Sequence, residues 1–462
     1  MLATTLRSLL IMGFSGCIAA CAGVPVRPAP AVAASAPQAA APPPPLAADV
    51  PTAADAEVDA THALTPGQAA SDVTPTAAMA DAPTDATVES DSRFVDVVTE
   101  EGQRARGLYF NGPMAHRLGA RGVINMVRGA ALNAAVIDIK DGEGRVTYDT
   151  QIPELLPERH VFLADAPAFV RTLKEAGVYV IARVVCFSDP VLARTEPDRA
   201  VQDGRPGHEG EIWEKNAHRN TWLNPYNEKN HDTIVKLAKD VEAMGFDEIQ
   251  FDYVRFPVDP ATVFAVFPGA SEAPRGEVLL GMLRRVDEAI HIPIGVDVFG
   301  ITALTRGDST GLLGQSLELW TKHVEVFSPM LYVNGMGEWM RRVTQGRAGL
   351  LVQQAVQQLR ARVGSGPVIR PFLQAFERGA DYYTPEFIAE QIRGSRQGGG
   401  DGFLFWHPAS NYGMVRAGML GPARSLMPFP MEARRAFRDE AWGKSPAASP
   451  AVAGELPGKP AS

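Results

Sequence analysis

The stretch GFDEIQFDYVRFP, residues 245–257, contains the most informative strand of the chain. A helical pattern ends just before it, and an alternating run follows. Successive side chains of a β-strand point to opposite faces, so Ile249 and Phe251 share one face while Gln250 and Asp252 share the other. A carboxylate flanked by large apolar residues is costly unless it is paired or used. Asp252 is therefore the first candidate site residue.

The unit to which this stretch belongs, a short β-rich run followed by a longer amphipathic segment, recurs from about Arg106 to His407. Eight strands are expected, at 107–111, 134–140, 179–185, 248–253, 292–298, 324–332, 368–374 and 402–406. The clearest helical patterns are at 168–176, 232–244, 277–290, 310–323, 353–363 and 385–397. Repeated strand–helix units imply parallel strands with right-handed crossovers.

Eight such units over about 300 residues have the size of a (β/α)₈ TIM barrel, so this α/β fold is predicted. An open doubly wound sheet is the alternative. Such a sheet usually carries a Gly-rich phosphate-binding loop after its first strand. Here the first strand runs into YFNGPMAHRLG, residues 109–119, which lacks that pattern.

The segments on either side of the barrel differ from it in composition. Residues 1–21 combine Arg7 with a short apolar run, which is typical of a signal peptide. From Ala22 to Ser92, 35 of 71 residues are Ala or Pro, so a disordered linker is expected over 22–95. The barrel domain is expected over 96–430, and a mostly disordered tail over 431–462.

The sequence Ile-Ala-Ala before Cys21 resembles the lipobox of bacterial lipoproteins. That resemblance implies lipidation of Cys21 and a membrane anchor, while an ordinary secretory signal peptide is the alternative. Ala22 follows in place of the Asp that resembles an inner-membrane retention signal. We therefore expect a protein secreted across the inner membrane and lipid-anchored at the outer membrane or in the periplasm.

The charge pattern argues against a nucleic-acid partner. The formal net charge is −9, and residues 22–92 carry nine acidic residues and one basic residue, so the barrel region is close to neutral. A nucleic-acid surface would need clustered Lys and Arg. No HxH, HExxH, GxSxG or Walker A pattern is present, so no metal and no cofactor are predicted. Cys186 is the one cysteine of the predicted barrel and is expected to be a buried small hydrophobe.

Charged residues gather at the predicted C-terminal ends of the strands, where barrel enzymes have their active sites. They are Asp138, Lys140, Arg183, Asp252, Arg255 and Asp297. Alternation places Asp138 and Lys140 on the inner face together. One pair, Lys140 with Asp138 or Asp252, could be a structural ion pair, but six charges at one rim predict a functional site.

Two carboxylates on adjacent strands suit the cleavage of a glycosidic bond, and a separation of about 5 Å favours retention of configuration. We assign Asp252 as the nucleophile and Asp297 as the general acid/base, with Asp138 as the alternative partner. The predicted substrate-binding residues are Asp138, Lys140, Arg183, Arg255, Tyr109, Tyr332, Gln374, Trp406 and His407. The long segment from Phe187 to about Lys229 carries two tryptophans, and it forms either a wall of the binding site or a lid with a core of its own.

Nine stretches from about Arg104 to Gly413 resemble, in order, the family called "putative glycosyl hydrolase domain". They are GLYFNG, VIDIKDGEG, IARVVCFSDP, WLNPYN, GFDEIQFDYVRFP, GVDVFG, SPMLY, PFLQAF and GFLFWHP. The resemblance implies a TIM barrel similar to the alpha-amylase clan and to endo-α-1,4-polygalactosaminidases. In that clan the nucleophile follows strand 4 and the acid follows strand 5, which corresponds to Asp252 and Asp297. The sequence departs from the family pattern at 333–336 and at His407.

These observations predict a glycoside hydrolase that cleaves O-glycosidic bonds of an extracellular or envelope polysaccharide. The alternative is a lipoprotein that binds polysaccharide on a barrel scaffold without cleaving it. Fold alone does not separate the two. Two convergent acids favour the enzyme, because a binding protein has no need of them.

Overall fold

The computed structural model describes residues 97–214, 221–258, 260–304, 308–333, 346–380 and 382–427. The predicted signal peptide, linker and tail lie outside these ranges, so their boundaries and the lipidation of Cys21 stay predictions. No helix within the described ranges has the length and apolar character needed to cross a membrane.

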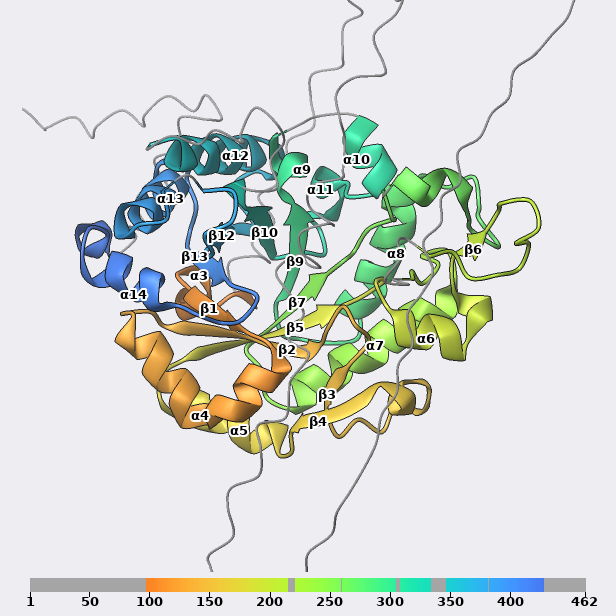
Figure 1. Ribbon diagram of the computed structural model, residues 1–462, viewed down its shortest axis with the longest axis horizontal. Helices are drawn as coiled ribbons and strands as arrows, with labels where there is room; N and C mark the ends of the chain where they lie inside the picture. The colour runs from red at the N-terminus through yellow and green to blue at the C-terminus, as the bar shows by residue number, and fades with distance from the viewer. Residues whose placement is uncertain are drawn as a thin grey trace, which may run out of the picture. The chain divides into compact units, whose positions relative to one another are not determined.

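Eight parallel strands form a closed barrel, which confirms the predicted (β/α)₈ fold (Figure 1). Around the barrel they are β1 (Arg106–Phe110), β2 (Ala134–Lys140), β5 (Tyr179–Val185), β7 (Glu248–Asp252), β9 (Ile294–Phe299), β10 (Val326–Leu331), β11 with β12 (Val368–Ile369 and Phe372–Gln374) and β13 (Phe403–Trp406). Pairing of β1 with both β13 and β2 closes the ring. All eight predicted strands are therefore present.

Helices pack around the ring. The longer ones are α4 (Gly112–Gly129), α5 (Ala166–Glu175), α7 (Glu228–Ala243), α8 (Arg275–Asp287), α12 (Arg347–Val363), α13 (Pro385–Gln397) and α14 (Gly413–Leu420). The shorter ones are α3 (Glu100–Gln103), α6 (Pro190–Thr195), α9 (Gly300–Leu304), α10 (Asp308–Leu313) and α11 (Leu317–Trp320). The single helix predicted over 310–323 is divided into α10 and α11, because Gly314 has a left-handed φ of 77°.

The sequence patterns missed α4, the longest helix, which has non-helical backbone at Gly119. Asn111 caps its first turn by accepting a hydrogen bond from the Met114 amide, and Pro113 occupies its first turn. Glycines at 112, 119, 122 and 129 weaken the helical signal, because glycine disfavours helix interiors. Burial of Val123 and Val127 against the sheet offsets that cost.

Additional strands lie beside the barrel. They are β3 (Val146–Tyr148) and β4 (Arg159–Leu163), which extend the sheet from β2, and the pair β6 (Gln202–Asp203) and β8 (Ala265–Val266). The long loop after β5 contains β6, and its Trp213 and Trp222 are each 1% exposed within the main core. These buried rings show that the loop packs on the main hydrophobic core, so neither tryptophan forms an open wall of a binding site.

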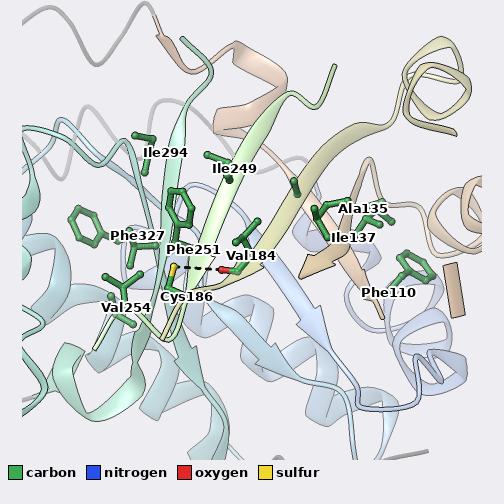
Figure 2. Packing of buried hydrophobic residues seen from close by; sticks show 14 of the residues in the cluster. Phe110, Ala135, Ile137, Val184, Cys186, Ile249, Phe251, Val254, Ile294 and Phe327 are labelled. Atoms are coloured by element: carbon green, nitrogen blue, oxygen red, sulfur yellow. Dashed lines mark hydrogen bonds between the residues drawn. The ribbon is translucent and has the colours of Figure 1, made fainter. Parts of the chain in front are cut away.

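The strands alternate between two apolar layers, as the sequence predicted. Ile137, Ile249 and Phe251 belong to the layer between sheet and helices, where Cys186 is also buried (Figure 2). A smaller apolar cluster fills the barrel interior and includes Val136 and Ile181. Near the N-terminal end of the barrel the interior also holds a fully buried ion pair, in which Arg370 Nη2 lies 2.7 Å from Glu248 Oε2.

Candidate active site

Four charged side chains occupy the C-terminal ends of four successive barrel strands. Asp138 lies on β2, Arg183 on β5, Asp252 on β7 and Asp297 on β9. The ladder pairs residue 138 with 183 and residue 251 with 296, so the next residues, Asp252 and Asp297, are neighbours across β7 and β9. The predicted inward direction of these carboxylates follows from the outward burial of the residues between them.

Arg183 connects the three carboxylates. Its Nη1 donates to Asp138 Oδ1 at 2.7 Å, and its Nη2 and Nε donate to Asp252 Oδ2 at 2.5 and 3.1 Å. Nε also lies 3.8 Å from Asp297 Oδ2. All three carboxylates are nearly inaccessible to solvent. One guanidinium thus faces three acids, which leaves the cluster with an excess of negative charge if all are ionised.

The carboxyl groups of Asp252 and Asp297 lie close together. Both Oδ2 atoms contact Arg183 Nε, at 3.1 and 3.8 Å, so these oxygens are at most about 7 Å apart. A retaining glycosidase holds its carboxyl groups about 5 to 5.5 Å apart, and an inverting one about 6.5 to 9.5 Å. The limit set by these two oxygens accommodates the retaining distance.

The two acids differ in their hydrogen bonds. Both oxygens of Asp252 accept bonds, Oδ2 from Arg183 and Oδ1 from the Tyr253 amide at 2.6 Å. Asp297 Oδ1 is buried and has no hydrogen-bond partner. Burial, followed by the charge of Asp252, raises the pKa of Asp297 well above its usual value. Asp297 is thus suited to carry a proton, while Asp252 accepts hydrogen bonds from a guanidinium and a backbone amide.

Asp138 is held by two donors rather than aimed at open space. Tyr109 Oη donates to its Oδ2 at 2.5 Å, and Arg183 occupies its Oδ1. Burial raises the pKa of Asp138 to about 6, although Arg183 and Tyr109 oppose the rise. With both oxygens engaged, Asp138 is better placed to orient Arg183 than to exchange protons with a substrate.

The backbone turns sharply after the central carboxylate. Tyr253 has a φ of 55°, a left-handed conformation that costs a residue with a side chain about 1 to 2 kcal/mol. The conformation directs its amide at Asp252 Oδ1. Strained backbone of this kind clusters at active sites. No pattern in the sequence marks position 253, because a left-handed residue here is neither Gly nor Asn.

Aromatic rings adjoin the acids. Trp406 packs against Tyr109 and Tyr332, with ring centroids 6.1 and 5.4 Å apart, and Phe376 contacts both Trp406 and Tyr332. Burial and the charges of Asp297 and Asp252 raise the pKa of Tyr332, which places this ring beside the carboxylates. The structure therefore brings the predicted residues Tyr109, Tyr332 and Trp406 together, and adds Phe376.

Lys140 does not join this cluster, so its predicted position beside Asp138 is wrong. The register of β2 against β5 shifts between Asp138 and Lys140, which breaks the strict alternation. The Lys140 ammonium instead lies 2.6 Å from Asp189 Oδ2 and 3.7 Å from Glu158 Oε2. Burial raises the pKa of Glu158 to about 9. No pattern in the sequence indicates these two partners, because Glu158 ends a short 3₁₀ helix and Asp189 caps the short helix α6.

Three other predicted substrate-binding residues have different surroundings. The Arg255 guanidinium is buried among aromatic rings, 4.6 Å from the Trp222 centroid and 4.5 Å from that of Phe299. Gln374 Nε2 donates to the carbonyls of residues 376 and 378 and so supports the loop that carries Phe376. His407 Nδ1 accepts from the amide of residue 409. Their roles in substrate binding stay predictions.

No group of three or more His, Cys, Asp or Glu side chains within the described ranges has the arrangement of a metal site. The three carboxylates of the cluster are separated by the Arg183 guanidinium, which takes the place that a cation would occupy.

A parallel (β/α)₈ barrel with carboxylates converging at its C-terminal end is the arrangement of barrel enzymes. The family model described as "Putative glycosyl hydrolase domain" matches residues 107–412. The chain belongs to this family, as its motifs predicted, and is a glycoside-hydrolase-like protein. No curated protein matches the chain.

Solved structures agree with the fold. The glycoside hydrolase domain of PgaB (BpsB) from Bordetella bronchiseptica is 15% identical, with a TM-score of 0.50 over 68% of this chain and 97% of that one. A hypothetical protein from Ruminiclostridium thermocellum is 29% identical over 41% of this chain and 97% of that one, with a TM-score of 0.36. The first likeness supports the barrel architecture.

Proposed function

We propose that this protein is a retaining glycoside hydrolase that cleaves O-glycosidic bonds of an extracellular or envelope polysaccharide. The observation that carries the proposal is the pairing of two unlike carboxyls on adjacent strand ends. Asp252 is held by charged and backbone donors, while Asp297 is buried with one oxygen unpartnered. Separation of two acids by environment is the pattern of general acid and nucleophile pairs.

In the first step Asp252 attacks the anomeric carbon and forms a glycosyl–enzyme ester. The bond from that carbon to the leaving oxygen breaks, and Asp297 donates its proton to that oxygen. In the second step water attacks the anomeric carbon, Asp297 accepts the water's proton, and Asp252 leaves as a carboxylate. Tyr332 and Trp406 lie beside the acids and provide flat apolar faces for a sugar ring.

The envelope location rests on the sequence alone. The apolar run before Cys21 and the lipobox-like sequence support secretion and a lipid anchor at Cys21, at the outer membrane or in the periplasm. The family membership supports an oligosaccharide or polysaccharide substrate.

A screen of polysaccharides for release of reducing ends tests the proposal, with the wild-type chain and Asp252→Asn compared at equal concentration. We expect wild-type cleavage with retained anomeric configuration by NMR, and a loss of about a thousandfold or more in Asp252→Asn. A matched variant, Asp141→Asn, changes an acid at the same end of β2 whose carboxylate pairs with Arg145, and should keep activity. Equal activity in wild type and Asp252→Asn would remove Asp252 from the mechanism. Binding of a glycan without any cleavage would support the non-catalytic alternative instead.

A further inference from the structure

The helices α13, α14 and α4 follow one another around one side of the barrel (Figure 1). Six arginines from these helices and the adjoining segments lie at the end of the barrel opposite the carboxylates. We call them the arginine rim: Arg106, Arg128, Arg393, Arg396, Arg416 and Arg424. Arg106 opens β1, and three of the others lie in the last turns of α4 and α13 or just after α14. Because these helices run against the strands, their C-terminal ends meet the N-terminal ends of the strands.

Hydrogen bonds and side-chain contacts link the rim arginines into one surface. Arg416 Nε donates at 3.3 Å to the carbonyl of Gly129, the neighbour of Arg128. Arg396 Nη1 donates at 3.0 Å to the Leu426 carbonyl, two residues beyond Arg424. Arg106 Nη1 lies 3.0 Å from the sulfur of Met427. Segments about 300 residues apart in the sequence thus supply one surface, which explains why no basic cluster is visible in the sequence.

Within the part of the chain that the structure describes, none of the rim arginines has a carboxylate partner. Their contacts go to carbonyls and a thioether, whereas exposed cations elsewhere pair with acids, such as Arg159 with Asp149 at 2.9 Å. Residues 102–137 and 402–427 contain no Asp or Glu. Three exposed acids at this end, Glu100, Glu101 and Glu175, are fewer than the rim arginines, and Glu100 pairs with Arg104 at 2.8 Å, so the rim keeps a positive excess.

The inner edge of the rim has unused donors. The buried Nε atoms of Arg104 and Arg106 have no hydrogen-bond partner. Burial and the nearby charge of Arg104 lower the pKa of Arg106, which shows that like charges face one another here. Capping of helix C-termini explains individual arginines, because a guanidinium satisfies the last carbonyls of a helix. It does not explain an excess of arginines without acids.

We propose that the arginine rim docks on the phosphate groups of an anionic lipid bilayer. Guanidinium groups match phosphate oxygens with paired hydrogen bonds. The described chain begins at residue 97, just before α3 and β1, so the preceding segment enters the barrel at the same end as the rim. The carboxylate cluster is at the other end of the strands, so docking turns the proposed active site away from the bilayer.

Because the predicted lipid anchor at Cys21 holds the protein at the membrane, a weak contact between the arginine rim and the bilayer is sufficient for docking. The linker predicted over 22–95 would tether the barrel near the surface to which Cys21 is predicted to be attached. At such effective concentrations a weak interaction is populated. Each arginine near a strongly anionic surface adds about fivefold to its partition. The docking does not depend on whether the barrel cleaves glycans.

Sedimentation with vesicles tests the proposal, using the chain from Ala22 to Ser462, which lacks Cys21 and so cannot be lipidated. We expect binding to vesicles of mixed phosphatidylcholine and phosphatidylglycerol, loss of binding in high salt, and no binding to phosphatidylcholine alone. The triple variant Arg128→Gln, Arg416→Gln, Arg424→Gln should bind at least about tenfold more weakly. The control triple Arg194→Gln, Arg205→Gln, Lys229→Gln removes as many exposed charges at the opposite end, from α6, the segment after β6 and the start of α7, and should bind like wild type.

Equal binding by the two triple variants would overturn the proposal, as would wild-type binding that ignores the lipid charge. Binding that appears only after the acids of residues 22–92 are replaced by Asn and Gln would assign the rim to the chain's own acidic segment instead. A second measurement does not depend on the triple variant: an environment-sensitive dye on Arg424→Cys should respond to anionic vesicles. The same dye on Arg205→Cys should not, and a reversed response would also overturn the proposal.

Discussion

Two buried arginines lie inside the barrel, near its opposite ends, and their partners differ. Arg370, near the N-terminal end, faces the single carboxylate of Glu248. At the C-terminal end Arg183 faces three carboxylates, those of Asp138, Asp252 and Asp297. Burial alone therefore does not identify the site, since both clusters are buried. The unequal number of acids and arginines does identify the site. A buried cluster with excess charge is costly, so it persists where it serves a function.

The largest effect on stability is expected at the Arg370–Glu248 pair, in which one arginine faces one acid. Arg370→Met leaves Glu248 buried without its cation and should lower the free energy of unfolding by about 3 to 5 kcal/mol. Urea titration measures it. Arg370→Met with Glu248→Leu removes both charges and should recover most of the loss. A single variant as stable as wild type would mean that the pair is not structural.

The next effect concerns the pH dependence of stability at the unbalanced cluster. Burial raises the pKa of Asp138 to about 6. The folded protein therefore binds a proton that the unfolded chain releases, so this group makes stability fall as pH rises from about 4 to about 6. The upper limit of that loss is about 3 kcal/mol. Asp138→Asn should remove this part of the slope in thermal unfolding between these pH values, and an unchanged slope would contradict the role given to Asp138.

Removal of the surplus acid should stabilise the fold. Asp297→Asn relieves the burial and the repulsion from Asp252 that raise the pKa of Asp297, and should gain about 1 to 2 kcal/mol. Unfolding in urea at neutral pH measures the gain. Asp252→Asn is the comparison, because it loses the contacts of Arg183 and should not gain as much. A destabilised Asp297→Asn would indicate that the acid contributes to structure.

The smallest effect is expected for Tyr109→Phe. The Tyr109 hydroxyl lowers the pKa of Asp138 by donating to its carboxylate, so its removal should move the pKa of Asp138 upward. The stability cost should be about 1 kcal/mol. The pH range over which stability falls should shift to higher values in the same unfolding series. Tyr412→Phe, which removes a hydroxyl bonded to the Tyr109 carbonyl, is a control that should leave that range in place.

Much of the barrel is predictable from the sequence because strand alternation is local. The inward direction of Asp252 and Asp297 follows from their apolar neighbours, and the structure confirms it. The same alternation puts Glu248 on the inner face with Gln250 and Asp252. The acidic member of the buried Glu248–Arg370 pair is therefore predictable from the sequence. Its partner Arg370 lies 122 residues away and is defined by the closed ring.

The surroundings of Lys140 depend on contacts that are distant in the sequence. Its alternation with Asp138 is regular in the sequence, but the register shift on β2 depends on the neighbouring strand β5. Its two acidic partners lie at the ends of short helical segments, whose positions are set by packing rather than by periodicity. The charge excess around Arg183 likewise appears only when four strands are placed side by side.

The reactivity of Cys186 toward thiol reagents can report local opening of the barrel. Its side chain is 2% exposed in the apolar layer outside the strands (Figure 2). Its amide donates to the carbonyl of Asp252 at 2.9 Å. Burial also raises its pKa, so a thiol reagent meets a protonated and covered group. Labelling therefore waits for β5 to separate from β7, and its rate reports how often the strand bearing Asp252 comes free of its neighbour.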